Sequence, residues 1–325
     1  MKDRAPRNRT VFVSDEEKPL LTSRLVEVTG PLPMIDIENR TVHGDLLEIL
    51  EWLPERFVDL LILDPPYNLS RTFGETNFRQ QSMHDYHRWF ESWFPNLLRC
   101  LRPKASIYIC GDWRSSAAIH LVAGEYLNVR NRITWEREKG RGAKANWKNC
   151  SEDIWFCTVG NEYTFNVEAV KLKRRIVAPY TLNGEPKDWT REDDGNYRLT
   201  YPSNLWTDLS VPFWSMPENT DHPTQKPEKL IAKLILASSN PGDIVLDPFV
   251  GSGTTSSVAR KLGRRFVGIE KELEYCLLTE KRLLLAESGT SIQGFADGVF
   301  WERNSLRDQK STASQGTKLN NQLTL

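Results

Sequence analysis

The chain has 325 residues, 43 of them basic and 43 acidic, so its formal net charge is zero and any nucleic-acid partner must be bound by a local surface. Five cysteines without a CxxC pair argue against a zinc site and a disulfide framework. The cysteine pattern predicts no metal. No segment is apolar enough to span a membrane, and the N-terminal MKDRAPRNRT lacks the apolar core of a signal peptide, which predicts a cytoplasmic protein with no membrane attachment.

The first half of the chain alternates between strand and helix patterns. Residues 1–39 are polar and interrupted by prolines, which predicts an N-terminal arm that is mostly irregular, with a short helix near Leu20. The elements expected next are a strand at 39–45, a helix at 46–53, a strand at 57–64, a helix at 84–101, a strand at 105–110, a helix at 115–126 and two β-rich segments at 130–135 and 153–165.

The second half resumes this alternation after an interruption. Residues 166–220 are polar, rich in Pro, Trp and Asn, and are expected to be irregular; from 289 onward a polar, weakly ordered C-terminal tail is expected. Between them the pattern predicts a helix after Pro227, a strand at 244–247, a glycine-rich loop at 248–255, a helix at 256–262, a strand at 264–270 and a helix at 271–287. Aliphatic strands alternating with helices predict an α/β fold, with a mostly parallel sheet and helices on both faces.

The glycine-rich loop PFVGSGTT lies between a strand and a helix, as in nucleotide-binding folds. Gly251 and Gly253 allow positive φ and close approach of a ligand, and Glu270, at the end of the next strand, is placed to accept hydrogen bonds from ribose hydroxyls. A dinucleotide site would carry a third glycine, and a triphosphate site a Lys-Ser pair, and both are absent. The Asp247-Pro248-Phe249 opening favours an adenosyl ligand with an amino-acid tail over a tight turn that binds nothing.

The stretch LLILDPPYNLS carries a carboxylate directly after a buried strand. Asp64 is therefore expected at the carboxyl edge of the sheet, where open α/β sheets bind ligands. Pro65 and Pro66 remove two donors, so the carboxylate and a carbonyl form a rigid pair of acceptors that suits an exocyclic amine. Tyr67 offers a face on which an extruded base can stack. The alternative is an ordinary proline-rich turn with a solvated acid.

Together, DPPYNL, HPTQKPEKLI, VLDPFVGSGTT and RRFVGIE resemble the motifs of amino-group DNA methyltransferases that use S-adenosylmethionine. Because DPPY precedes the glycine loop, the order resembles the β group of these enzymes, a circular permutation of the same Rossmann-like fold. The resemblance covers about residues 40–288. It implies a catalytic half at 40–165, a target-recognition region inserted at 166–220, and a cofactor-binding half at 221–288, followed by the tail at 289–325.

The resemblance also assigns roles to particular residues. The catalytic amino-group clamp is expected at Asp64, Pro65, Pro66 and Tyr67. S-adenosylmethionine is expected to contact, besides Asp64, the residues Asp45, Leu46, Lys226, Asp247, Phe249, Gly251, Ser252, Gly253, Thr254 and Glu270. Lys226 is expected to neutralise the methionine carboxylate, and His222 is interpreted as a turn residue without a catalytic role.

A basic stretch at 130–148 holds seven Lys and Arg residues against two Glu, with two tryptophans. Such a stretch beside the active edge is expected to follow DNA phosphates, and a solvated charged hairpin is the alternative. Residues 68–86, after the clamp, are expected to form a loop that closes on the flipped base. The expected phosphate contacts are Arg137, Lys139, Arg141, Lys144 and Lys148.

The leading hypothesis is a site-specific DNA adenine-N6 methyltransferase that acts on double-stranded DNA as the partner of a restriction endonuclease. Aspartate at position 64 favours adenine, since cytosine-N4 members of this family often carry serine there. A cytosine-N4 enzyme is the runner-up, followed by a non-catalytic DNA-binding relative and a nicotinamide oxidoreductase. Neither the recognition sequence nor the choice between monomer and homodimer follows from the sequence.

Overall fold

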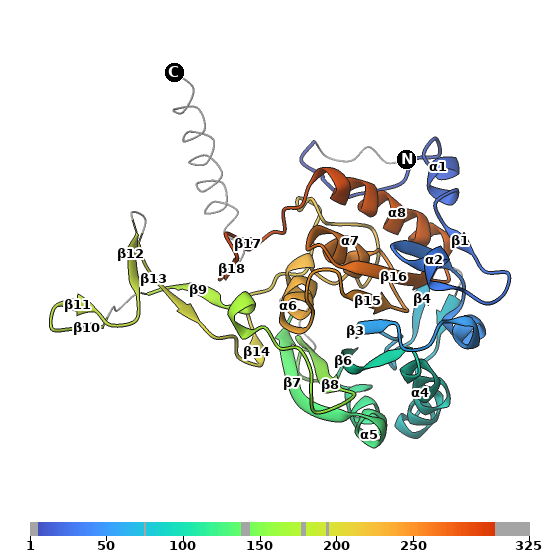
Figure 1. Cartoon of the computed structure of the whole chain (residues 1–325), viewed down its shortest axis with the longest axis horizontal. Coiled ribbons are helices and arrows are strands. Elements are labelled where there is room, and N and C mark those ends of the chain that lie inside the picture. The colour runs from blue at the N-terminus through green and yellow to red at the C-terminus, as the bar shows by residue number, and fades with distance from the viewer. Residues whose placement is uncertain (1–5, 75, 138–143, 177–179, 193–194, 303–325) are drawn as a thin grey trace.

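The computed structural model describes residues 6–302, apart from 75, 138–143, 177–179 and 193–194 (Figure 1). A nine-stranded sheet forms its centre. Every neighbouring pair in it is parallel except the two pairs made by β8, which runs against both of its neighbours. The mostly parallel sheet predicted from the sequence is confirmed. Its strands, in spatial order, are β1 (Val26–Glu27), β2 (Arg40–His43), β16 (Arg265–Glu270), β15 (Ile244–Asp247), β3 (Val58–Leu63), β6 (Leu101–Gly111), β8 (Ser151–Thr158), β7 (Asn128–Glu136) and β14 (Leu205–Trp206).

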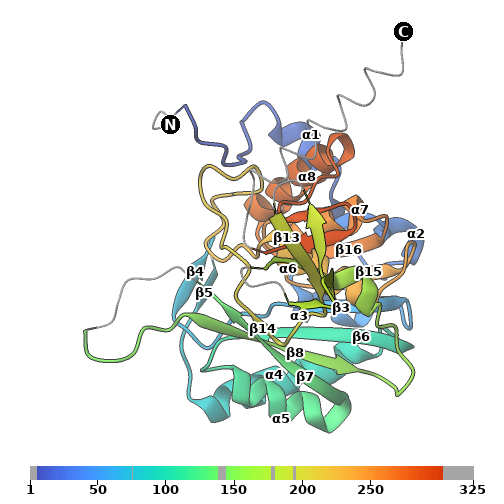
Figure 2. The ribbon, with the colours of Figure 1, turned by 90° about the vertical axis from the view of Figure 1, so that its left-hand side faces the viewer.

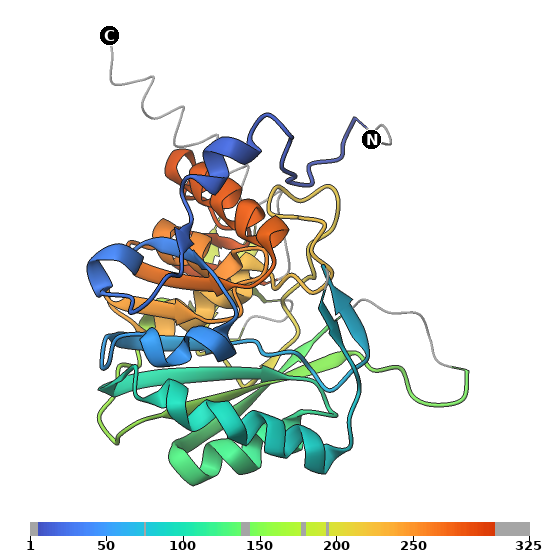
Figure 3. The same cartoon turned by 90° about the vertical axis from the view of Figure 1, so that its right-hand side faces the viewer.

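Helices cover both faces of this sheet, because its central strands are apolar on both sides. Leu61 and Leu63 of β3 belong to one buried cluster, whereas Leu60 and Ile62 belong to another. Figures 2 and 3 show α4 and α5 on one side of the sheet, and α6, α7 and α8 on the other. The helices are α3 (Leu46–Ile49), α4 (Met83–Leu98), α5 (Ser116–Tyr126), α6 (Glu228–Ser238), α7 (Thr254–Lys261) and α8 (Leu273–Ser288).

The aromatic stripe of α4 belongs to the core, as its helical spacing predicts. Tyr86, Phe90 and Phe94 are fully buried in the cluster on this face of the sheet. The helix begins after Ser82, whose hydroxyl accepts a hydrogen bond from the Asp85 N–H at 3.1 Å. Helix α4 therefore holds the segment after β3 against the sheet.

The N-terminal arm contains more structure than the expected irregular chain. It holds α1 (Lys18–Thr22), which is the short helix predicted near Leu20, and also β1 and α2 (Met34–Ile37). Leu21 and Leu25 pack on Cys276 and Leu277 of α8. This apolar contact brings Val26 into register with Val42, so the arm supplies an edge strand of the main sheet.

Parts of residues 166–220 and the start of the expected tail form a second sheet, which corrects the prediction that both are irregular. It has five strands and projects from the side of the main body in Figure 1. Phe300 and Trp301 of this sheet are buried, and Phe300 packs in the same apolar cluster as Leu60 and Ile62 of β3. The remainder of the tail, 303–325, lies outside the described residues. The strands, in spatial order, are β12 (Thr190–Glu192), β13 (Gly195–Thr200), β9 (Leu172–Arg175), β18 (Val299–Trp301) and β17 (Phe295–Ala296); β10 (Thr181–Leu182) and β11 (Glu185–Pro186) pair separately, as do β4 (Arg71–Phe73) and β5 (Thr76–Phe78).

Three buried charges join the second sheet to α6. The Asp208 carboxylate lies 2.7 Å from Lys229 and 2.8 Å from Lys233, and the Lys229 ammonium also donates to the Trp301 carbonyl of β18. Burial lowers the pKa of Lys233 to about 8, since Asp208 offsets only part of the cost of removing the ammonium from water. One acid therefore holds two lysines at the junction.

Replacement of Asp208 by alanine should destabilise the protein strongly. Removing one partner leaves two buried ammonium groups without their counter-ion, which costs about 3–5 kcal/mol. Urea unfolding followed by circular dichroism measures this loss. The control is Glu162→Ala, which breaks the Lys104–Glu162 pair, where both side chains are largely exposed (73% and 81%). The role assigned to Asp208 is wrong if both variants unfold at the wild-type urea concentration.

Candidate functional site

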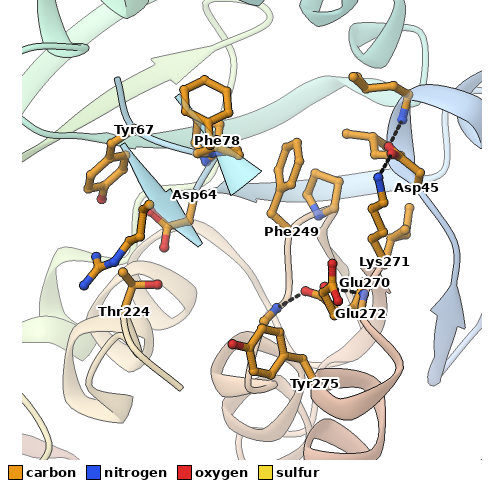
Figure 4. Close-up of a pocket in the computed structure, with 18 of the residues that line it drawn as sticks. Asp45, Asp64, Tyr67, Phe78, Thr224, Phe249, Glu270, Lys271, Glu272 and Tyr275 are labelled. Atoms are coloured by element: carbon orange, nitrogen blue, oxygen red, sulfur yellow. Dashed lines mark hydrogen bonds and ion pairs between the residues drawn. The ribbon is translucent and has the colours of Figure 1, made fainter. Parts of the chain in front are cut away.

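The residues that the sequence motifs single out meet at the carboxyl edge of the main sheet. Strands β3, β16 and β2 all end there, and a cavity of about 250 Å³ opens between their loops. Figure 4 shows Tyr67 and Asp64 toward one side of this cavity, Glu270 toward the other, and Phe249 between them. The clamp and the ribose acid predicted from separate motifs therefore share one cavity.

The clamp residues follow β3 in a fixed arrangement. Asp64 Oδ2 accepts a hydrogen bond from the Lys226 ammonium at 2.6 Å, and Oδ1 is buried with no hydrogen-bond partner among the residues that the structure describes. The Pro66 carbonyl accepts from the Tyr86 hydroxyl at 3.0 Å. No described group donates to the Pro65 carbonyl, which directly follows Asp64 in the chain. It is therefore the proline carbonyl that can accept a hydrogen bond from a ligand. The acceptor pair expected for an amine corresponds to Asp64 Oδ1 and the Pro65 carbonyl.

Tyr67 places its ring at the cavity and its hydroxyl in a buried charge network. The hydroxyl donates to Glu152 Oε2 at 3.0 Å and accepts from Lys226 at 3.0 Å. Burial, together with the nearby carboxylates of Asp64 and Glu152, raises the pKa of Tyr67 well above its ordinary value, so the phenol stays neutral. Because the hydroxyl both donates and accepts a hydrogen bond, the orientation of the Tyr67 ring is fixed.

Lys226 lies beside the Asp64 carboxylate, whereas its motif predicted a position beside the carboxylate of the cofactor. Its side chain is 7% exposed, and its ammonium is 2.6 Å from Asp64 and 3.5 Å from Glu152. Burial acts to lower the pKa of Lys226, but the carboxylates of Asp64 and Glu152 outweigh it and raise this pKa well above its usual range. The lysine is therefore charged.

The glycine loop leaves no room for side chains at its two glycines. Gly251 has φ of +53°, and a Cβ on it would lie 3.0 Å from the His222 ring. Gly253 has φ of +79°, and a Cβ there would come within 2.7 Å of Thr279. Both positions require the left-handed region that glycine adopts without strain. The backbone at Gly251 can thus form part of the cavity wall.

Glu270 fixes this loop with its own carboxylate. Oε2 accepts from the Gly251 N–H at 2.9 Å, and Oε1 accepts from the Glu272 N–H at 2.9 Å. Burial raises the pKa of Glu270. Glu270 lines the cavity, each of its oxygens can accept a further hydrogen bond, and a ribose diol has two hydroxyl donors to match them.

Four of the residues expected to contact the cofactor also shape the loop. Asp247 accepts from the Thr255 hydroxyl at 2.5 Å and from the Phe249 N–H at 3.1 Å, and burial raises its pKa to about 7. Ser252 and Thr254 accept hydrogen bonds from Arg282 of α8, and Gly253 packs on that helix. None of these four lines the 250 Å³ cavity, but Asp247, Ser252 and Thr254 line a smaller cavity that shares Asp64, Lys226 and Gly251 with it.

The opposite wall comes from the loop after β2. Asp45 accepts from the Leu47 N–H at 3.0 Å, as the cap of α3, and pairs with Lys271 at 2.9 Å. Asp45 and Leu46 both line the cavity, as expected. Sequence reasoning missed the aromatic lining supplied by Phe78, Trp89 and Tyr275. The helical spacing of Trp89 indicated a place in the core, and no motif includes Phe78 or Tyr275.

The residues present fit the S-adenosylmethionine implied by the motifs. An apolar wall with aromatic side chains suits a purine, the Glu270 carboxylate suits a ribose, and acidic groups suit a sulfonium cation. His222 does not add a competing charge, since burial and the neighbouring cations Lys226 and Arg71 lower its pKa to about 3. No group of three metal-ligating side chains was found among the described residues.

The basic stretch at 130–148 begins within β7, and the residues expected on DNA follow that strand. Arg137, expected on DNA, pairs instead with the buried Glu152, which contacts the clamp, so its charge is already compensated. Lys144 and Lys148 are exposed, as phosphate contacts require, and Trp147 between them is 94% exposed. Lys139 and Arg141 lie outside the described residues.

Within the described ranges, no helix is long and apolar enough to cross a membrane.

Two solved structures resemble this fold. One is the complex of M1.HpyAVI with SAM, with a TM-score of 0.52, 25% sequence identity and coverage of 75% of this chain and 98% of that one. The other is the cytosine-N4-specific PvuII DNA methyltransferase, with a TM-score of 0.55, 19% identity and coverage of 80% and 88%. The second match shows a shared fold.

Sequence relatives and a family model agree with these structures. The chain is 34% identical over 253 residues to the DNA adenine methyltransferase YhdJ of Escherichia coli K12, which covers 75% of this chain and 82% of YhdJ. It is 33% identical over 250 residues to the type II methyltransferase M.HpaI of Haemophilus parainfluenzae, covering 76% and 74%. A model for N6 and N4 methyltransferases, described as DNA methylase, matches residues 58–281. The chain therefore belongs to the N6/N4 DNA methylase family.

Proposed function

We propose that this protein transfers a methyl group from S-adenosylmethionine to the N6 amino group of adenine in double-stranded DNA. The observation that carries the proposal is the geometry of Asp64. One of its carboxylate oxygens is buried without a partner among the described residues, beside the Pro65 carbonyl, and both belong to the cavity that also holds Glu270. Two fixed acceptors at the end of a cofactor cavity suit a group with two N–H donors.

The chain's own groups account for activation of such an amine. An exocyclic amine on a purine is a weak nucleophile, because its lone pair is delocalised into the ring. Acceptance of both hydrogens by Asp64 and the Pro65 carbonyl favours a tetrahedral nitrogen and localises the lone pair. The bound cofactor supplies an electrophilic methyl group. As positive charge develops on the nitrogen, the fixed carboxylate stabilises it more than it stabilises the neutral amine.

Adenine is favoured over cytosine by two observations. Position 64 is aspartate, and the relative YhdJ is named a DNA adenine methyltransferase. The name type II methyltransferase, borne by M.HpaI and M.BglII, supports a pairing of this protein with a restriction endonuclease. Nucleoside analysis of DNA from cells that express the protein distinguishes N6-methyladenine from N4-methylcytosine, and sequencing that detects modified bases locates the target.

Asp64→Ala and Asp64→Asn should both lower the single-turnover methylation rate by about a thousandfold or more, while DNA still binds. Loss of one preorganised charge aimed at the reacting centre has this order of effect on the chemical step. The asparagine variant keeps the shape and loses the charge. Rapid-quench assays with labelled cofactor measure the rate, and Asp36→Asn, an exposed acid on α2, is the matched control. Near wild-type methylation by Asp64→Asn would refute the clamp mechanism.

Glu270→Ala should raise the dissociation constant for S-adenosylmethionine and leave DNA affinity nearly unchanged. Two lost hydroxyl contacts to a charged acceptor cost on the order of 2–4 kcal/mol. Isothermal titration calorimetry measures the change, with Glu274→Ala, an exposed acid of α8, as control. If both variants bind the cofactor as the wild type does, Glu270 does not hold the ribose.

Replacing Lys144 and Lys148 by alanine should weaken DNA binding equally on cognate and random duplexes. Each lost phosphate contact reduces the slope of log K against log salt by about 0.9. Fluorescence anisotropy over a range of salt concentrations measures both effects. The control is Lys104→Ala, whose side chain pairs with Glu162 on the surface. A loss restricted to the cognate duplex would instead make this stretch a reader of bases.

A further inference from the structure

Glu152 is a buried acid at the clamp that no motif of the sequence analysis includes. It lies in β8, its side chain is 5% exposed, and both of its oxygens are engaged. Oε1 pairs with Arg137, while Oε2 accepts from the Tyr67 hydroxyl at 3.0 Å and lies 3.5 Å from the Lys226 ammonium. Burial of an acid costs free energy unless it is paired in this way. Arg137 thus keeps Glu152 in place, with its second oxygen directed at the clamp.

Lys226 presents to Asp64 the same chemistry that a substrate amine would present. Its ammonium donates to Asp64 Oδ2 at 2.6 Å and to the Tyr67 hydroxyl at 3.0 Å. A target amine held by Asp64 Oδ1 and the Pro65 carbonyl would share the Asp64 carboxylate with this lysine, which weakens the attraction left for the amine. A lysine that stayed on Asp64 would also repel the positive charge that develops on the attacking nitrogen. Efficient transfer therefore requires a second position for the ammonium.

We propose that Glu152 is a positioning residue that receives Lys226 when the target amine binds to Asp64. The ammonium is already 3.5 Å from Glu152 Oε2, so a small rotation of the lysine side chain suffices. Tyr67 bonds to the same oxygen, which couples the position of the lysine to the orientation of the stacking ring. The two acids Asp64 and Glu152 balance the two cations Lys226 and Arg137 before and after the exchange. The proposal rests on the methyltransferase function proposed above and adds a step of substrate entry to it.

The test is a double-mutant cycle with Glu152→Gln and Lys226→Met. Glutamine keeps an acceptor for the Tyr67 hydroxyl and removes the charge that attracts Lys226. In the wild-type background, Glu152→Gln should lower the single-turnover rate by roughly 30- to 100-fold, which is the size of a strong coupling between neighbouring groups. In the Lys226→Met background, where no ammonium has to move, the same change should alter the rate by less than about threefold. Equal losses in the two backgrounds would overturn the proposal and make Glu152 a purely structural acid.

A second measurement does not depend on methylation. Adenosine is titrated into the four proteins saturated with S-adenosylhomocysteine, which fills the cofactor cavity. Glu152→Gln should weaken adenosine binding when Lys226 is present and leave it unchanged when Lys226 is methionine. Equal weakening in both backgrounds counts against the exchange. If the wild type methylates no DNA, the proposed function fails, and this titration still decides the role of Glu152.

Folding of the variants is checked by thermal melting and by affinity for S-adenosylhomocysteine. Glu162→Gln, an exposed acid beyond the end of β8, is the matched control for the charge loss. If Glu152→Gln does not fold, Glu152→Asp enters the same cycle, because it keeps the charge and moves it away from Lys226 by one methylene. The aspartate should give the same background-dependent loss, and a loss independent of Lys226 would again overturn the proposal.

Discussion

The ion pair between Asp64 and Lys226 is the interaction on which the geometry of this site depends. A carboxylate at the end of a buried strand loses most of its hydration, and a single ammonium at 2.6 Å compensates that loss while one oxygen stays available. The same ammonium lies near Glu152 and the Tyr67 hydroxyl, so one cation organises both an acid and an aromatic platform. A buried charge of this kind is costly for stability and useful for chemistry, because the weakly polar surroundings strengthen its action on a reacting group.

The main sheet and the elements beside it hold the chain that carries Asp64 in place. Strand β3 is apolar on both faces and lies at the centre of the nine strands, so the chain that follows it has little freedom. The prolines restrict it further, and the Tyr86 hydroxyl of α4 holds the Pro66 carbonyl. On the other side, Glu270 holds the Gly251 N–H. Clamp and cofactor loop are therefore each fixed by a hydrogen bond from the element next to them.

Contiguous features could be predicted from the sequence, whereas long-range pairs could not. The strand that ends at Leu63, the glycine loop and the acid at Glu270 each follow from a local pattern of residues. The partner of Lys226 could not be predicted, because a sequence does not tell whether a lysine pairs with a carboxylate of the protein or with one of the cofactor. Arg137 looked like one more cation in a basic stretch, and only the pairing of β7 with β8 brings it to Glu152. The aromatic lining of the cavity and the burial of Phe300 depend in the same way on the tertiary fold.

The position of β18 in the second sheet has a consequence for biosynthesis. Strand β18 pairs with β9, although β14, β15, β16 and the helices α6, α7 and α8 lie between them in the chain. The Trp301 carbonyl also accepts a hydrogen bond from Lys229 of α6. During translation the nine-stranded body can assemble first, because all its strands leave the ribosome before β18 does. The five-stranded sheet can close only after residue 301 has emerged. A nascent chain, or one shortened before this point, would thus carry the clamp and the cofactor cavity without a complete second sheet.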